Sequence, residues 1–226
     1  MTERLFGLAQ GATRIVPKQQ TSQHFSGTIV AVKARICLLR SFDQISHSYL
    51  GYVLVLEGTL DAEPVDELRI AVAPKDHERH RFRIGDRVEG MALKVADPRT
   101  EWATHHKASG LRAIERGPSE QDVPANPDGG LAPPLEEYRA RGHRRLNKAT
   151  HEKHCRRCPF GLAMPTEIII DQWDPSRKRW RLETHCYGPR DCAVYRAGKP
   201  YRVPGRKPGM VWVDDDVERE AEWSEG

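Results

Sequence analysis

Four cysteines in the last third of the chain constrain its fold more than any other feature. They form a C-x2-C pair and a C-x5-C pair, at Cys155, Cys158, Cys186 and Cys192. Residues 159 to 185 separate the pairs, which is enough chain for a β-hairpin that returns to its starting point. Two such pairs at the ends of a hairpin can place four thiolates around one Zn2+ at about 2.3 Å. We therefore predict a structural zinc site at these four residues.

Disulfides, free thiols and an iron centre for electron transfer are the alternatives for these cysteines. Residues 1 to 20 contain no apolar run of the length that a signal peptide needs, so we expect a cytoplasmic protein, where disulfides are rare. His151, His154 and His185 are close enough in the sequence to replace one cysteine ligand. Because four protein ligands leave no open position on the metal, the pattern predicts a structural centre and not a catalytic one.

The common catalytic motifs are missing from the sequence. The segment from His151 to His154 is one residue short of H-E-x-x-H, and Pro159 follows the C-x2-C pair, whereas zinc deaminases need a proline before it. No Walker loop, dinucleotide fingerprint or G-x-S-x-G elbow is present. Cys37 lies in a predicted strand and is expected to be a small packing residue rather than a nucleophile. We therefore expect no enzyme activity.

The net charge of +4 is unevenly distributed along the chain. Lys and Arg outnumber Asp and Glu by 18 to 6 over residues 138 to 210, compared with 17 to 14 over residues 1 to 116. Residues 117 to 137 and 211 to 226 are acidic. A cationic field concentrated on the cysteine region attracts polyanions, and nucleic acid is the commonest intracellular candidate. A solvated basic surface neutralised by the acidic tail is the alternative.

Composition also predicts the domain organisation. Residues 117 to 134 contain five prolines and three glycines, which is typical of a linker or an extended surface loop. We expect an N-terminal arm over residues 1 to 24, a β-rich domain over 25 to 116, a basic cysteine module over 135 to 213 and an acidic tail over 214 to 226. The longest apolar stretch, Tyr49 to Leu56, is too short to cross a bilayer, so no membrane association is expected.

The sequence of the β-rich domain predicts five strands, over residues 27–39, 49–57, 68–73, 88–95 and 108–114. Alternation in the first strand predicts one buried face, with Thr28, Val30, Val32, Ala34, Ile36 and Leu38. Lys33 and Arg35 fall on the opposite face. The segment from Pro74 to Arg83 is expected to be a short charged connection. The fold class is therefore mostly β with minor α.

A glycine-aspartate step lies before the fourth strand and has the pattern F-x-x-G-D-x-V-x-G, formed by Phe82, Gly85, Asp86, Val88 and Gly90. Together with the long first strand and a closing fifth strand, it resembles the OB-fold over about residues 25 to 116. An SH3-like barrel is the competing architecture. The resemblance implies a partly open five-stranded Greek-key barrel, whose second and third strands and flanking loops commonly bind single-stranded nucleic acid or oligosaccharide.

The cysteine module is predicted to open with a basic helix and to continue as a hairpin. Pro134 and two glutamates begin the helix, and Gly142 is where it bends or ends. Residues 167–173 and 180–184, joined by a turn over 174–178, form a hairpin that returns Cys186 towards Cys155 and Cys158, as in a zinc ribbon.

Single-stranded DNA or RNA is the expected partner, with the protein acting as an accessory subunit of a larger complex. Binders of this kind use Arg and Lys for the phosphate backbone. The candidate contacts are Lys33, Arg35, Arg139, Arg141, Arg144, Arg145, Arg156 and Arg157. The alternative is a protein-interaction adaptor with a structural zinc, which grips acidic protein partners and does not bind nucleic acid.

Overall fold

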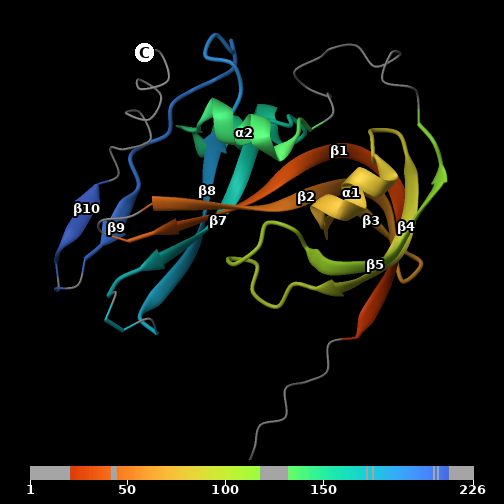
Figure 1. Ribbon diagram of the computed structural model, residues 1–226, viewed down its shortest axis with the longest axis horizontal. Helices are drawn as coiled ribbons and strands as arrows, with labels where there is room; N and C mark the ends of the chain where they lie inside the picture. The colour runs from red at the N-terminus through yellow and green to blue at the C-terminus, as the bar shows by residue number, and fades with distance from the viewer. Residues whose placement is uncertain are drawn as a thin grey trace, which may run out of the picture.

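The computed structural model describes residues 21–41, 45–117, 132–171, 173–174, 176–205, 207 and 209–213. The predicted acidic tail, most of the linker and most of the N-terminal arm lie outside these residues. Strands dominate the described part, which confirms a mostly-β class (Figure 1). The elements in chain order are β1 (Ser22–Arg40), β2 (Ile45–Leu60), β3 (Glu63–Val72), α1 (Pro74–His80), β4 (Arg87–Lys94), β5 (His105–Glu115), α2 (Leu135–Arg141), β6 (Arg144–Arg145), α3 (Lys148–Thr150), the π-helix η1 (His151–Cys155), β7 (Gly161–Ile169), β8 (Lys178–Cys186), β9 (Arg202–Pro204) and β10 (Val211–Val213).

The first five strands form a ring in the order β1-β2-β3-β5-β4, which returns to β1. All neighbours are antiparallel except β3 and β5, which run parallel where Ile70 pairs with His105. Each of the five predicted strands overlaps one of these strands. The expected connection from Pro74 to Arg83 instead contains α1, a helix with proline in its first turn and Arg81 in the left-handed conformation after its last residue.

A bulge in β1 changes which of its residues are buried. The register with β2 shifts between Ile29 and Ala31, so Phe25 and Ile29 are buried before the bulge, whereas Val32, Ala34, Ile36 and Leu38 are buried after it, as predicted. Thr28 is exposed and Val30 half-buried, and their predicted burial was therefore wrong. A bulge inserts one residue and reverses the faces of the strand beyond it, which periodicity alone does not reveal.

The turn that contains the glycine-aspartate step is hydrogen-bonded to β1 at this bulge. Ile29 N–H donates to the carbonyl of Asp86 at 2.8 Å, and Gly85 N–H donates back to the carbonyl of Ile29 at 2.8 Å. Gly85 has φ 86°, a conformation that glycine adopts without strain. The buried Asp86 carboxylate accepts from the backbone of Arg83 and Gly117. This turn therefore fixes the start of β4 beside β1.

The C-terminal half extends the same sheet. β7 pairs in parallel with the end of β1, at Leu38–Arg40 against Thr166–Ile168, and β8 and then β6 follow β7. The predicted hairpin is confirmed as β7–β8, although β7 begins earlier than expected. Residues of both halves belong to one buried apolar cluster, which includes Phe25, Ile36, Leu54, Tyr138, Leu162, Met164 and Tyr187.

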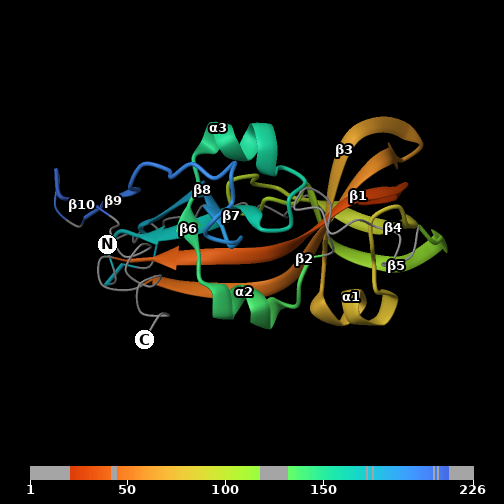
Figure 2. The same cartoon turned by 90° about the horizontal axis from the view of Figure 1, so that it is seen from above.

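The helices of this half lie on opposite sides of β1 and β2. Figure 2 shows α2 on one side of the sheet and α3 on the other. α2 buries Leu135 and Tyr138 in the apolar cluster and ends where Gly142 takes φ 66°, as its sequence predicted. No helix among the described residues is both long and apolar enough to cross a bilayer.

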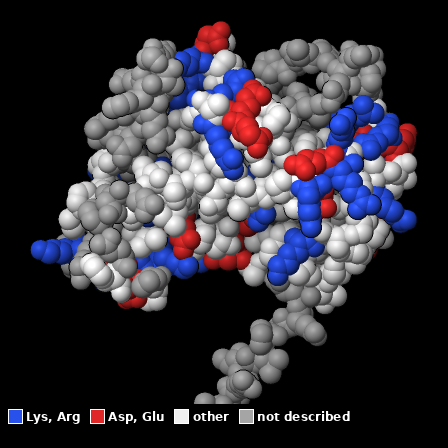
Figure 3. Space-filling model, viewed as in Figure 1, with Lys and Arg blue, Asp and Glu red and all other residues white. Residues whose placement is uncertain are grey.

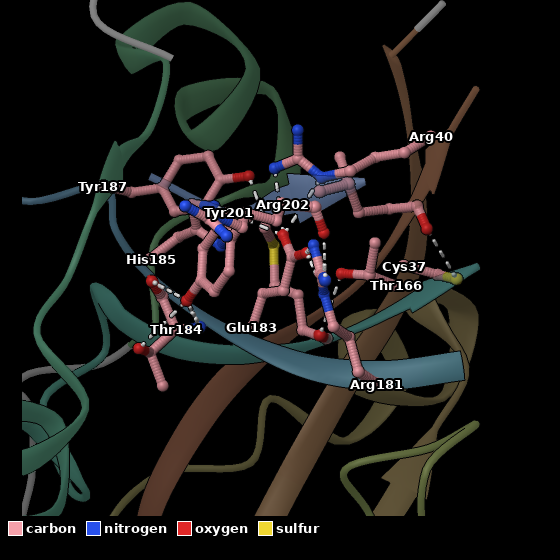
Figure 4. A network of polar contacts seen from close by, with 12 residues as sticks. Cys37, Arg40, Thr166, Arg181, Glu183, Thr184, His185, Tyr187, Tyr201 and Arg202 are labelled. Carbon is pink, nitrogen blue, oxygen red and sulfur yellow. Dashed lines mark hydrogen bonds and ion pairs between the residues drawn. The ribbon is translucent and has the colours of Figure 1, made fainter. Parts of the chain in front are cut away.

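A buried ion pair ties the hairpin to the end of β1. Arg40 is 1% exposed and donates to Glu183 Oε2 from Nε at 3.1 Å and from Nη2 at 2.9 Å. The other oxygen of the fully buried Glu183 accepts from Arg181 Nε at 2.7 Å. Figure 4 shows both guanidinium groups converging on this carboxylate beside Tyr201. Glu183 thus bridges a cation of the ring and a cation of the hairpin.

Candidate metal centre

A short helical segment delivers the first cysteine pair. Asn147 caps this segment by accepting a hydrogen bond from Thr150 N–H at 3.2 Å, and the chain then continues through α3 and η1 to Cys155. Cys158 follows in the turn that leads into β7. We refer to residues 155–158 as the knuckle. Its position is set by the capped helical segment before it and by β7 after it.

The hairpin returns the second pair to the knuckle. Cys186 ends β8 and pairs with Gly161, the first residue of β7. Gly161 lies directly against Cys155, because a Cβ atom added to Gly161 would be 2.5 Å from Cys155 Cβ. Cys192 lies in the loop after β8, where its N–H donates to the carbonyl of Pro189 at 3.3 Å. The pairing of β7 with β8 therefore brings Cys186 beside Cys155, as predicted.

All four cysteines line one cavity of about 210 Å³, together with Phe160, Gly161, Tyr195 and neighbouring residues. All five cysteines of the chain are described, and none forms a disulfide. Within the described part of the chain, no group of three or more His, Cys, Asp or Glu side chains stands in position to hold a metal ion. The fold thus gathers four thiols around a common cavity without converging them on one point. Four sulfur donors are a set that suits Zn2+.

The two buried thiols of the cavity, Cys155 and Cys186, have raised pKa values. Burial, followed by the neighbouring Cys158 and Cys186, raises the pKa of Cys155 to about 11. Burial also raises the pKa of Cys186, although hydrogen bonds from Gly188 N–H, at 3.3 Å from Sγ, and from Arg144 act in the opposite direction. Because metal ligands must be thiolates, a bound cation would displace these protons. The two hydrogen bonds would stabilise the Cys186 thiolate once the proton is lost.

The three candidate histidines occupy different places. His154 is exposed and lines the cavity. His151 is buried, and it shares a hydrogen bond with the backbone of Gly161. His185 is fully buried and packs against His143 and Tyr201. It directly precedes Cys186 on β8, and successive residues of a strand point to opposite faces. Of the three, His154 alone is placed to join the cysteines.

Lys33 contacts the knuckle, a role that sequence reasoning missed. Its side chain is fully buried, and Nζ donates to the carbonyls of Cys155 at 2.9 Å and Arg156 at 2.8 Å. The ammonium also lies 5.1 Å from the centre of the Trp102 ring. Burial lowers the pKa of Lys33 to about 7, against the opposing effect of Cys158 and Cys155. Lys33 was predicted to contact nucleic acid, which is wrong because the knuckle and Trp102 cover it.

Most of the other predicted contacts are already engaged within the protein. Arg145 is buried. Four arginines form ion pairs, which are Arg35–Glu101, Arg141–Glu137, Arg156–Glu67 and Arg157–Glu57. Arg139 lies over the Tyr49 ring at 4.6 Å, and Arg144 over the Tyr195 ring at 4.1 Å. Figure 3 shows basic side chains interspersed with acidic ones on the face of the molecule that is viewed in Figure 1. The predicted set therefore does not form one continuous cationic surface.

A substitution of Gly161 tests the close packing of the knuckle on β7 and leaves all four cysteines unchanged. Gly161→Ala is expected to weaken Zn2+ binding, because the new methyl group would push the knuckle away from β7. Overpacking of this kind typically destabilises a protein by about 1 to 3 kcal/mol. Competition with a chelating dye measures the affinity, and Ala163→Ser, two residues along the same strand, serves as the control. Unchanged zinc affinity in Gly161→Ala would show that the knuckle and β7 are not in close contact.

No protein-family model, curated protein or solved structure gave a match to this chain.

Proposed function

We propose that the chain is a non-enzymatic binding protein, built on an OB-like ring and a structural Zn2+ centre formed by Cys155, Cys158, Cys186 and Cys192. One observation carries the proposal: cysteines from the knuckle, the end of β8 and the following loop line a single cavity. The zinc would tie these three segments together. Four cysteine ligands leave no open coordination position for a substrate.

The strand order of the ring supports the OB-like part of the proposal. An OB-fold is a five-stranded, partly open Greek-key barrel that binds ligands through strands 2 and 3 and their flanking loops. Here the ring closes in the order β1-β2-β3-β5-β4. The knuckle reaches over β2 and β3, where Arg157 pairs with Glu57 and Arg156 pairs with Glu67. The usual ligand face of the ring is therefore partly covered by the protein itself.

We place the ligand surface on the loop that carries Cys192. Residues 138 to 210 contain 18 Lys and Arg but only 6 Asp and Glu, so the module stays cationic after its internal ion pairs are formed. Arg190, Arg196 and Lys199 of this loop are exposed. Arg144 lies against the loop and donates to the carbonyl of Pro189 at 2.8 Å. Zinc bound to Cys192 would hold these cations in fixed positions for phosphate groups. Single-stranded nucleic acid is the ligand that this arrangement favours.

The triple variant Arg190→Gln, Arg196→Gln, Lys199→Gln is expected to lose most of its affinity for a labelled single-stranded oligonucleotide at low salt. Each phosphate contact on a single strand contributes about −0.7 to the slope of log K against log salt, so the slope should flatten by about 2. Fluorescence anisotropy across a salt series measures both quantities. Lys75→Gln, Arg79→Gln, Arg87→Gln removes the same charge from exposed positions on α1 and β4 and is the matched control. Equal losses in the two variants would contradict the assignment of the loop.

A protein-interaction adaptor is the second candidate, and exposed apolar side chains in the β7–β8 turn and at β10 favour it. Trp173 is 75% exposed, and Met210, Val211, Trp212 and Val213 are also exposed. Large exposed apolar groups of this kind are common at protein interfaces. If wild-type protein shows no oligonucleotide binding at 50 mM salt, the adaptor function replaces nucleic-acid binding, whereas the zinc centre is tested separately.

A further inference from the structure

Lys33 is a buried ammonium group that joins the ring to the candidate metal centre. It lies on β1 after the bulge, 122 residues before Cys155 in the sequence. Its side chain has no exposure to solvent. Trp102 closes the site from outside, with the Lys33 ammonium 5.1 Å and the Arg69 guanidinium 4.9 Å from the centre of its ring. The ammonium is therefore enclosed between the sheet, the knuckle and an aromatic side chain.

Both hydrogen bonds of Lys33 go to the knuckle. The carbonyls of Cys155 and Arg156 accept them at 2.9 Å and 2.8 Å, and both residues lie in the C-x2-C segment. Lys33 is fully buried at this contact. Carbonyl dipoles alone are a weak counter-charge for a fully buried cation, because burying an unpaired charge is costly. Lys33 thus contacts the backbone of the knuckle, and no carboxylate of the described residues forms an ion pair with it.

A zinc ion bound by four thiolates carries a net charge of −2. We propose that Lys33 is the internal counter-ion of this zinc centre and the anchor that holds the knuckle on the ring. The inference rests on the proposed zinc site. Zinc and Lys33 then stabilise one another, since coupling between two sites is reciprocal. Metal binding therefore strengthens the contact between the module and β1, and the ring in turn raises the affinity of the module for metal.

The test compares full-length wild type with Lys33→Met, which keeps the length of the side chain but removes its charge and its hydrogen bonds. Zn2+ affinity is measured by competition with a chelating dye. Lys33→Met should bind zinc about 10- to 100-fold more weakly, the range seen when groups that support metal ligands are replaced. Arg35→Met removes a cation from the same face of β1, where Arg35 pairs with Glu101 and does not contact the knuckle. This control should stay within about threefold of wild type.

Denaturation of the metal-free and zinc-loaded proteins separates a counter-ion from a purely structural residue. A counter-ion loses its partner when the metal leaves, so Lys33→Met should lower the denaturation midpoint of the loaded protein only. In the metal-free protein, removal of a buried charge should leave the midpoint unchanged or raise it. Equal losses with and without zinc would overturn the counter-ion role.

Lys33→Gln, which retains hydrogen-bond donors without the charge, repeats both measurements and replaces Lys33→Met if that variant does not fold. Unchanged zinc affinity in the folded variants would overturn the inference while leaving the zinc site intact. A wild-type protein that binds no zinc would instead refute the proposed site itself.

Discussion

Replacing Cys155 with serine is expected to abolish stable zinc binding and to unfold the C-terminal half of the protein. Zinc binding contributes about 10 to 16 kcal/mol in small zinc modules, which is comparable to or larger than the roughly 5 to 15 kcal/mol of net stability of a typical domain. Cys155 is buried at the junction of η1, β7 and β8, so its loss affects all three. Amide hydrogen exchange followed by mass spectrometry should show the largest loss of protection in β7 and β8.

The ring should also lose stability in this variant, although less than the hairpin does. β7 pairs with β1, and Tyr138 and Met164 share the buried cluster of the ring. Cys37→Ser is the matched control, because Cys37 is the fifth cysteine and lies on β1 away from the cavity. It should retain zinc and melt within a few degrees of wild type. A Cys155→Ser variant with wild-type stability and wild-type protection in β8 would contradict the metal-dependent account.

Glu183→Gln is expected to destabilise the protein by about 3 to 5 kcal/mol, because it leaves Arg40 as a buried cation without its carboxylate. Glu183 and Arg40 are 0% and 1% exposed, and Arg181 depends on the same carboxylate. Urea denaturation followed by circular dichroism measures the change in the free energy of unfolding. Because the pair joins β8 to the end of β1, a single transition should shift as a whole.

Two further variants identify the origin of this effect. Glu167→Gln breaks the partly exposed pair with Lys178 on the same hairpin, and such pairs contribute at most about 1 kcal/mol. The double variant Arg40→Met, Glu183→Leu removes both charges and should recover much of the lost stability. If Glu183→Gln is no more destabilising than Glu167→Gln, the buried ion pair does not hold the two halves together.

Local sequence patterns were sufficient to predict the five strands of the ring and the hairpin that brings Cys186 beside Cys155. Alternation marked the five strands of the ring, and the spacing of the cysteines predicted that β8 would return Cys186 to Cys155. These features depend on residues that are near one another in the sequence or joined by one hairpin. The helix α1 was missed because the charged segment from Pro74 to His80 buries none of its residues and so has no apolar periodicity.

Long-range contacts could not be predicted in the same way. Lys33 has the sequence context of a solvent-facing cation, and its burial depends on residues 102, 155 and 156, which the fold brings to it. The arginines of the knuckle likewise pair with Glu57 and Glu67, about 90 to 100 residues away. A single sequence carries no periodic signal for such pairings. The contact of Lys33 with the knuckle could therefore be found from the structure but not from the sequence.

The most direct test of the zinc centre is elemental analysis of freshly purified full-length protein by inductively coupled plasma mass spectrometry. The four cysteines around one cavity predict one equivalent of zinc per chain, which Cys186→Ser should lose and Cys37→Ser should keep. One equivalent of iron with visible absorption would replace zinc by an electron-transfer centre in the same site. Less than half an equivalent of any metal in the wild-type protein would contradict the metal centre itself.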